Sequence, residues 1–214
     1  MATLKDRAYH NLKAQIIVAE PGTVFSVRKS AAELKLSYTP VREALMKLKS
    51  EGLLEVIPNV GFSVVQMDFK SIRSIYQSRE CVERYVLPQV VEKIDEDDLL
   101  VLRSYIARQK AALSKGDLSI FTEMDEEFHV YLIDLLQNKQ ITDFYRSIRN
   151  QYRIGSQKVA QKHSCLPVEE HEQFLQLIEE KQFKASLEYL YHHTNEAVER
   201  MKEGFVKINL YVTA

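Results

Sequence analysis

The sequence is poor in residues that interrupt or cross-link a chain: it has six glycines, five prolines and two cysteines among 214 residues. So little glycine and proline argues against long disordered or low-complexity tracts. Cys81 and Cys165 do not make a disulfide framework and fit a reducing cytoplasm. No apolar run approaches the roughly 20 residues that cross a bilayer, and the N-terminus lacks the apolar core of a secretory signal. We therefore expect a cytoplasmic globular protein without membrane association.

Charge of either sign is not in excess, because the net charge is -1. This balance argues against an indiscriminate nucleic-acid binder, but the charges are unevenly placed. Residues 1–66 hold nine Lys/Arg and six Asp/Glu, whereas residues 67–214 hold twenty and twenty-four. A chain of this length suits two domains. A modestly basic first domain on an acidic second one suits phosphate contact by the first.

The first part of the chain carries three helical patterns. Apolar residues at helical spacing predict a helix over residues 4–18, which Pro21-Gly22 ends, and a short helix over residues 27–35. The sequence Ser37-Tyr38-Thr39-Pro40 predicts the start of a third helix. We expect Ser37 or Thr39 to supply the capping oxygen, with Pro40 near the first helical position. This helix is expected to end near Gly52.

Two short β-branched runs follow the third helical pattern. Leu53–Ile57 and Phe62–Val65 are separated by Pro58-Asn59-Val60-Gly61, which is a hairpin signal. Three helices followed by a hairpin predict a winged helix-turn-helix.

The remainder of the chain shows helical patterns alone. Short loops between them predict neighbouring helices that pack roughly antiparallel in a bundle. The expected fold is therefore mainly α, with a winged helix-turn-helix domain at residues 1–67 and an all-helical domain at 68–214. The six helices are expected at about 69–94, 97–114, 118–136, 139–161, 168–180 and 183–207.

The third helix carries a family resemblance. The stretch Ser37–Leu45, then Leu48 and Glu51-Gly52-Leu53, resembles the recognition-helix signature of GntR-type repressors. Upstream, Tyr9, Leu12, Ile16 and Pro21-Gly22 match that family's first helix and turn, and Gly61 stands at its wing-tip glycine. The resemblance covers the whole first domain and implies binding to operator DNA.

The residues agree with this role. A recognition helix places its N-terminal residues against base edges in the major groove. Arg42, on the first turn, can form a bidentate pair with guanine. The helix start with Ser37 suits phosphate, and Thr39 suits phosphate or a thymine methyl. The resemblance also implies a base or phosphate contact by Arg28, and Gly61 would let the wing backbone enter the minor groove.

One position departs from the family pattern. Where the family usually has arginine, this chain has Tyr38, which cannot fork onto guanine as an arginine does. We therefore expect an operator that differs from the family's usual sequence. The alternative for Arg42 is a surface ion pair with Glu43 or Glu51.

Histidines gather in the second half of the chain. Asp125 and His129 lie four residues apart and so share one helix face. His171 opens the fifth helix of the expected bundle, and His192 and His193 lie in the last. A carboxylate and imidazoles from three helices that converge in a bundle core can hold a first-row metal ion.

A second resemblance narrows this set. The second domain resembles the FCD domain of the FadR subfamily of GntR regulators, through Asp125–His129, Gln137-Asn138, Glu170-His171 and His193. Metal-binding members imply Asp125, His129, His171 and His193 as ligands here, for Zn, Ni or Mn. His192 is the alternative to His193, because only one of two adjacent helical residues can face the cavity. A hydrogen-bonded polar core without metal is the other alternative. His163, near a helix end, is expected to be exposed.

Arginines indicate the chemistry of an effector. The resemblance places Arg79 at a position that faces the FCD cavity, and Arg149, Tyr152 and Arg153 share the fourth helix of the bundle. An inward arginine clamps a carboxylate bidentately, so we expect a small organic or sugar acid held by Arg79, Arg149 and Tyr152. Alternatively, these arginines form surface ion pairs with Glu80, Glu83 or the acidic loop 95–98.

The sequence thus predicts a transcriptional regulator, most simply a repressor. A homodimer would place two recognition helices on a near-palindromic operator, and the effector would shift the arrangement of the two DNA-binding domains. A metal-dependent hydrolase is a competing class, but the chain has no HExxH, nucleophile elbow or glycine-rich phosphate loop. A protein-interaction bundle would leave Arg28 and Arg42 without a role. Salt-sensitive binding to duplex DNA separates these classes.

Overall fold

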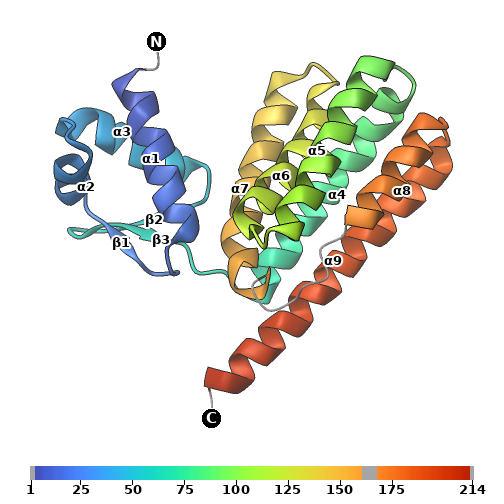
Figure 1. The fold of residues 1–214 in the computed structure, drawn as a ribbon. Helices are drawn as coiled ribbons and strands as arrows, with labels where there is room; N and C mark the ends of the chain where they lie inside the picture. The colour runs from blue at the N-terminus through green and yellow to red at the C-terminus, as the bar shows by residue number, and fades with distance from the viewer. Residues whose placement is uncertain (1–2, 161–167, 213–214) are drawn as a thin grey trace.

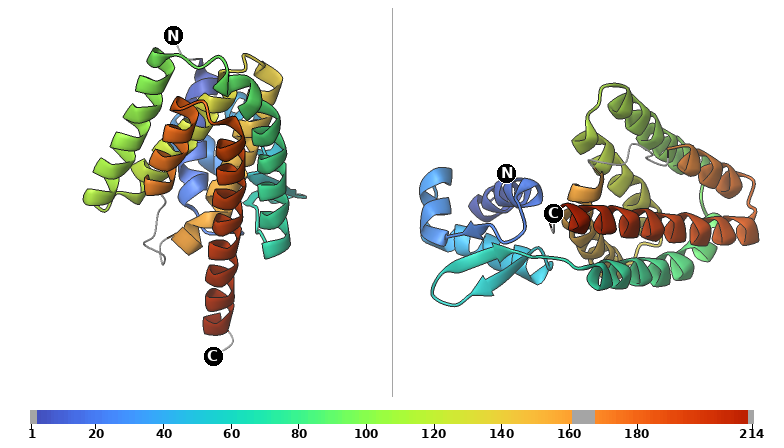
Figure 2. Two further views of the ribbon diagram at one scale, coloured as in Figure 1. Left: turned by 90° about the vertical axis from the view of Figure 1, so that its right-hand side faces the viewer. Right: turned by 90° about the horizontal axis from the view of Figure 1, so that it is seen from below.

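The computed structural model describes the backbone of residues 3–160 and 168–212 and consists of two parts (Figure 1). A small N-terminal domain combines three helices with a sheet, and a bundle of helices follows it. Figure 2 shows the small domain to one side of the bundle in the view from below. The predicted fold class is confirmed. His163 and Cys165 lie outside the described residues.

The N-terminal domain begins with α1 (Leu4–Val18), α2 (Val27–Leu34) and α3 (Tyr38–Ser50). Its antiparallel sheet has the order β1-β3-β2, with β1 at Val24–Phe25, β2 at Leu54–Ile57 and β3 at Gly61–Val64. The hairpin of β2 and β3 is the predicted wing. Buried apolar side chains from α1, α3 and β3 form the core of this domain, namely Ala8, Leu12, Ile16, Leu45, Leu48 and Val64.

Strand β1 was not expected from the sequence. It has only two residues, and Val24 and Phe25 pair with Ser63 and Phe62 of β3. A periodic pattern needs more residues than that, so the strand depends on pairing with a distant part of the chain. Its place at the edge of the wing ties the segment before α2 to the hairpin.

The start of α3 differs in detail from the expectation. Ser37 occupies the N-cap position with extended backbone, but its side chain makes no capping hydrogen bond, and Pro40 is the third helical residue. The expected side-chain cap is therefore wrong for this conformation. The hydroxyl groups of Ser37 and Thr39 are left on exposed residues at the helix start.

Six helices of the described residues form the bundle. Their bounds lie within three residues of those predicted, except that α9 ends five residues later. Helix α9 packs against α4 and α8, and α7 packs against α4 and α6. Apolar residues such as Leu102, Phe128 and Ile178 form the bundle core. No helix in the described part of the chain is long and apolar enough to span a membrane. The helices are α4 (Phe69–Val91), α5 (Glu96–Ser114), α6 (Leu118–Asp134), α7 (Lys139–Ala160), α8 (Val168–Glu179) and α9 (Phe183–Val212).

Aspartates set where three of these helices begin. Asp68 and Asp117 accept hydrogen bonds from the backbone N–H three residues ahead, and Asp95 forms a reciprocal capping box with Asp98. Such caps satisfy backbone donors that have no partner within the helix. Because Asp68 starts α4 directly after the sheet domain, the cap also marks the passage from one domain to the next.

Candidate functional site

Three histidines from three helices meet inside the bundle. His129 of α6, His171 of α8 and His193 of α9 are all buried, and each offers a ring nitrogen within 4.8 Å of the others. The Nε2 atoms of His129 and His171 are 3.2 Å apart. Two nitrogens that each bind one ion at about 2.1 Å have a separation of this kind. The donor set therefore fits a divalent transition metal.

His192, which precedes His193 in the chain, faces away from the histidine cluster. The His192 side chain is 73% exposed and lies 3.9 Å from Glu196 on the same helix. The His193 side chain is only 7% exposed. The packing of α9 against the bundle decides which of the two neighbours enters the cavity.

Hydrogen bonds orient two of the buried rings. Gln109 Oε1 lies 2.8 Å from Nδ1 of His171, and Glu170 Oε2 lies 2.5 Å from Nδ1 of His193. Both partners are acceptors, so Nδ1 of each ring carries the proton and Nε2 keeps a free lone pair. Partners of this kind fix the tautomer of metal-binding histidines. No sequence pattern pointed to Gln109, and Glu170 was notable only as the neighbour of His171.

Burial keeps two of these histidines, His129 and His171, neutral. Desolvation lowers the pKa of His129 well below its ordinary value, and the positive charges of Arg79 and Arg149 lower it further. Desolvation also lowers the pKa of His171 to about 3, although Asp125 opposes the shift. Neutral imidazole is the form that binds a metal ion, so protons do not compete for these nitrogens near neutral pH.

Asp125 borders the histidine cluster. Its Oδ1 lies 3.4 Å from Nε2 of His171 and 4.0 Å from Nε2 of His129, while Oδ2 accepts a hydrogen bond from Arg149 Nη2. Burial raises the pKa of Asp125, but Arg149, His171 and Arg79 lower it by more, so its pKa lies below the ordinary value. An ionised carboxylate thus stands beside the three nitrogens.

Arg79 is also inside the bundle, not on its surface. Its Nε donates to Glu83 Oε1 at 2.8 Å, and its Nη2 lies 3.3 Å from Nε2 of His129. Tyr145 donates a hydrogen bond to the same Glu83 oxygen. The bundle core around the histidines therefore holds two guanidinium groups, Arg79 and Arg149, paired with two carboxylates, Glu83 and Asp125.

Arg149 has N–H donors that make no hydrogen bond to the described residues. It is 1% exposed, and its Nε and Nη1 atoms have no hydrogen-bond partner among the described residues. Its guanidinium lies 5.2 Å from the ring of Tyr152, whose ring in turn meets Tyr76 edge-on. Arg153, which shares this helix, pairs with Glu126 at 3.2 Å. Of the arginines expected to face inward on α7, Arg149 is the one beside Asp125.

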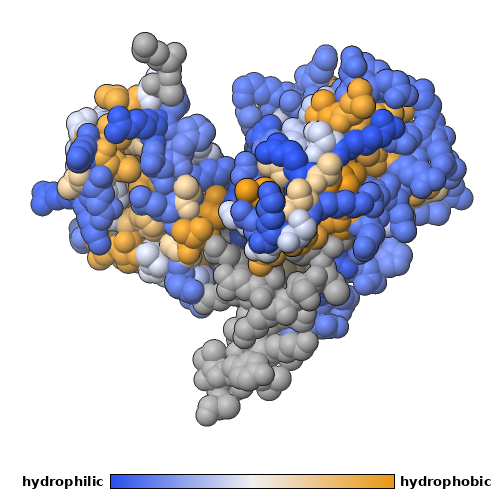
Figure 3. Space-filling model, in the orientation of Figure 1, coloured by the Kyte–Doolittle hydropathy of each residue, from blue (hydrophilic) through white to orange (hydrophobic). Residues whose placement is uncertain are grey.

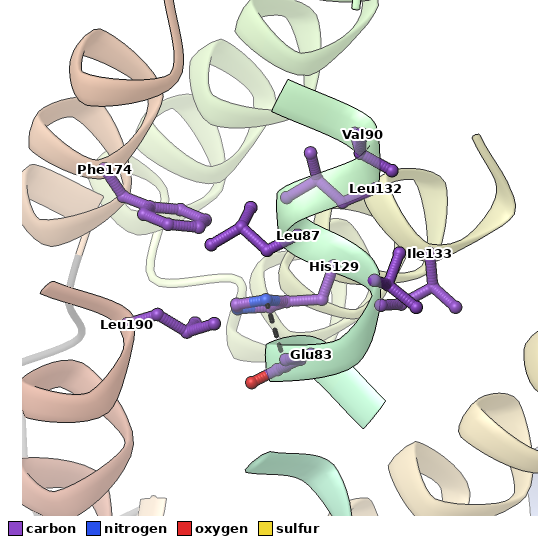
Figure 4. A pocket seen from close by; sticks show the side chains of 9 residues that line it. Glu83, Leu87, Val90, His129, Leu132, Ile133, Phe174 and Leu190 are labelled. Carbon is purple, nitrogen blue, oxygen red and sulfur yellow. Dashed lines mark ion pairs between the residues drawn. The ribbon is translucent and has the colours of Figure 1, made fainter. Parts of the chain in front are cut away.

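A small cavity adjoins His129 and Glu83, as Figure 4 shows. Its volume is about 20 Å³, which suffices for about one water molecule. Apart from His129 and Glu83, its lining is apolar: Val86, Leu87, Val90, Leu132, Ile133, Phe174 and Leu190. An organic acid would have to widen this space.

Residues predicted to contact DNA lie on the other domain. Tyr38, Thr39 and Arg42 are exposed and line one shallow groove along α3, and Arg28 and Ser37 are exposed nearby. The groove is completed by Lys5, Glu43, Met46, Lys47 and Ser50.

The expected alternative partners of Arg42 are occupied by other groups. Glu43 pairs with Lys5 at 3.2 Å, and Glu51 accepts hydrogen bonds from Tyr9 at 2.9 Å. Arg42 has no ion pair within the described part of the chain.

Gly61 has a structural requirement of its own. It begins β3 with φ of 149°, a conformation that other residues rarely adopt, and a Cβ there would lie 2.7 Å from the carbonyl oxygen of Phe25. The wing can thus pair with β1 only if this residue is glycine. The turn itself is at Pro58–Val60, where Val60 N–H bonds Ile57 O at 3.1 Å.

Comparisons with known proteins agree with both parts of the molecule. The FCD domain family matches residues 74–196, and the gntR family of bacterial regulatory proteins matches residues 4–64. The Nta operon transcriptional regulator of Aminobacter aminovorans is 31% identical over 137 residues, which cover 63% of this chain and 64% of that protein.

Two further similarities extend over nearly the whole chain. The gluconate operon transcriptional repressor of Bacillus subtilis (strain 168) is 25% identical over 207 residues, covering 92% of this chain and 84% of the repressor. The solved structure of E. coli McbR/YncC shares the fold, with a TM-score of 0.85 at 20% identity, and the match covers 96% of this chain and 100% of that one. The chain therefore belongs to the GntR family of bacterial transcriptional regulators and carries an FCD domain in its second half.

Proposed function

We propose that this protein is a repressor that binds operator DNA through α3 and releases it when an organic acid enters the FCD domain. The observation that supports DNA binding is the exposed Arg42 without an ion pair, beside Tyr38 and Thr39 in one groove. A homodimer would place two such helices on the two halves of a near-palindromic site. The division into domains at residues 67 and 68 and a cytoplasmic location belong to the same proposal.

To test operator binding, the full-length protein is used to select binding sites from random duplex DNA. We expect a two-fold repeated motif, with affinity that falls as salt concentration rises. Recovery of duplexes without any common motif would contradict the proposal. Measuring complex size at the selected site determines whether two chains bind together.

In the FCD domain, His129, His171, His193 and Asp125 would hold a divalent metal ion, with Zn, Ni and Mn as candidates. The convergence of the ring nitrogens and the two acceptors behind them support this assignment. When bound, such an ion would offer open coordination positions to an oxygen ligand. The chain's own role is to present neutral imidazoles and an ionised carboxylate from helices that packing holds in place.

Charge balance supports an anionic effector. Two guanidinium groups already face two carboxylates around the histidine cluster, so a bound dication would leave an excess of positive charge. An ion at His129 would also lie close to Arg79, whose Nη2 is 3.3 Å from Nε2 of that ring. A carboxylate that accepts hydrogen bonds from Arg79 and Arg149 beside Tyr152 would offset the excess positive charge and the repulsion between the ion and Arg79.

The effector class proposed here is a small organic or sugar acid, and the similarity to a repressor of a gluconate operon is in line with it. Entry requires the cavity beside His129 to widen, since its present volume is about 20 Å³. The bundle would therefore have a closed and a wider arrangement, and the effector would bind the wider one.

A panel of organic acids, added to the metal-loaded protein on its selected DNA, tests this part. We expect at least one acid to release the protein, whereas the matching amide or alcohol does not. If neutral analogues release the protein equally well, the carboxylate clamp is wrong.

A further inference from the structure

Three side chains of helix α7 bind one residue of the DNA-binding domain, Glu51. Ser147 Oγ and Gln151 Nε2 donate hydrogen bonds to the backbone carbonyl of Glu51, each at 3.2 Å, and Asn150 Nδ2 donates to its carboxylate at 3.3 Å. Residues 147, 150 and 151 lie on one face of a helix. Figure 3 shows the two domains touching over part of their facing surfaces, with a notch beside the contact.

Glu51 stands where the recognition helix ends. It is the C-cap residue of α3, and Tyr9 of α1 donates to both of its carboxylate oxygens at 2.9 Å. Glu51 thus joins the first helix of the DNA-binding domain, the end of the recognition helix and α7 of the bundle, through both its carboxylate and its backbone carbonyl. A displacement of α7 therefore acts on α3 directly, without passing through the linker at residues 65–68.

The next residue, Gly52, makes this close approach possible. It has φ of +74°, and a Cβ there would lie 2.6 Å from Nε2 of Gln151. Glycine adopts this backbone conformation without strain. It also leaves room for the Gln151 amide to reach the Glu51 carbonyl. The backbone conformation at Gly52, directly after α3, therefore permits this contact.

Other residues of α7 point into the bundle core, where Tyr145 and Arg149 are fully buried. Arg149, which precedes Asn150, donates to Asp125, and Tyr145 donates to Glu83. Asp125 is also the carboxylate beside the histidine cluster. A ligand that draws Asp125 away from Arg149 changes the packing of the turn that holds Asn150 and Gln151.

We propose that Glu51 is the positioning residue through which α7 sets the orientation of the recognition helix, so that a change at Arg149 in the cavity alters operator affinity. This inference rests on the function proposed above and adds the route between its two sites. It assigns no direct DNA contact to Glu51. The coupling passes through the three hydrogen bonds between α7 and Glu51, which shift when α7 moves.

The test measures operator affinity of the full-length protein, without metal and with Zn²⁺ alone, on a duplex selected by the wild type. For the wild type we expect Zn²⁺ to change the dissociation constant by about fivefold or more, which is typical of allosteric coupling. The double variant Asn150→Ala, Gln151→Ala should bind Zn²⁺ with unchanged stoichiometry but show less than about a twofold change. Gln140→Ala, an exposed glutamine on α7, is the matched control and should respond like the wild type.

A response of wild-type size in the double variant overturns the inference. A Glu51→Gln variant keeps the backbone carbonyl and one side-chain oxygen, so it should retain most of the response, whereas Glu51→Ala should lose part of it. Equal responses in these two variants would contradict a role for the side chain.

A wild type whose operator affinity does not respond to Zn²⁺ would show that the metal alone does not displace α7, and a second measurement then decides the inference. Small-angle X-ray scattering of the metal-free protein reports how the DNA-binding domains are held. A larger radius of gyration in the double variant than in Gln140→Ala supports positioning by α7. Equal radii overturn it, whatever the metal does.

Discussion

His129 and His171 are separated by 42 positions in the chain, yet their Nε2 atoms lie 3.2 Å apart in the bundle core. Helices α6 and α8 bring the two rings together, and α9 adds His193 to them. With Nε2 of His171 unprotonated, Nε2 of His129 either donates a hydrogen bond to it or turns a second lone pair toward it. An ion between the two rings accounts for the second arrangement.

Metal analysis checks this directly. Purified wild-type protein, incubated with Zn, Ni or Mn, should retain about one ion per chain, because four candidate ligands meet in one place. His171→Ala and His193→Ala should each lose it. His192→Ala is the matched control, since His192 is exposed on the same helix, and it should keep the ion. A metal-free wild type would leave the four side chains as a hydrogen-bonded polar core.

Glu170 should tune affinity for the ion without binding it. The Glu170 carboxylate lies 2.5 Å from Nδ1 of His193 and also pairs with Arg200 at 3.2 Å. Glu170→Ala removes the group that fixes the ring, and loss of such a partner typically weakens metal binding by about 10- to 100-fold. Saturating metal should still restore one ion per chain. Isothermal titration beside Glu169→Ala, an exposed neighbour in α8, measures the difference; equal affinities would contradict a positioning role.

Arg42 should determine base preference. Arg42→Ala is expected to cost about 1–3 kcal/mol of operator binding and to relax the preference at one base pair of each half-site, as for a bidentate guanine contact. Arg73→Ala, an exposed arginine on α4, should change neither. Binding assays on all single-base variants of the selected duplex give both quantities. A uniform loss across all sequences would instead assign Arg42 to phosphate.

Tyr38 should make the operator unlike that of relatives with arginine at this position. Its ring is 52% exposed beside Arg42, where it can stack or form one hydrogen bond but cannot pair bidentately with guanine. Tyr38→Arg should therefore shift the selected motif toward an added guanine. Repeating the selection from random DNA with this variant measures the shift, and an unchanged motif would remove Tyr38 from base recognition.

Acid should destabilise the metal-free protein through its buried histidines. Burial holds the pKa of His171 at about 3 and that of His129 well below 6.5, so below pH 6.5 the unfolded chain takes up protons that the folded chain excludes. The free energy of unfolding is therefore undiminished above this pH and falls as the pH decreases below it. Each histidine contributes about 1.4 kcal/mol per pH unit once its unfolded form is mostly protonated.

Urea unfolding of chelator-treated protein between about pH 6 and 4.5 measures this slope, within the range where these histidines titrate only in the unfolded state. His171→Gln, which cannot take up the proton, should reduce the slope by about one histidine's contribution. A slope that His171→Gln leaves unchanged would mean that the ring is protonated in the folded state.

Local sequence patterns predicted much of the fold. The periodicity of apolar residues predicted the helices of the bundle within a few residues, and the hairpin signal predicted the wing, because helix and turn preferences act over neighbouring residues. Strand β1 was missed since its two residues are ordered by Phe62 and Ser63 of β3. The side-chain cap expected at Ser37 is absent, because local preference does not fix the geometry of a cap.

By itself the sequence determined the fold class and the order of the helices and the hairpin. It predicted a recognition helix with Arg42, and it supplied a set of histidines and arginines in the helical domain. The tertiary structure decided which of them meet: His193 is buried and His192 exposed, Arg79 faces inward, and Gln109 and Glu170 lie behind the imidazoles. It also placed α7 against Glu51. These relationships depend on how six helices rotate and cross, which is set by packing between residues far apart in the chain and leaves no local pattern.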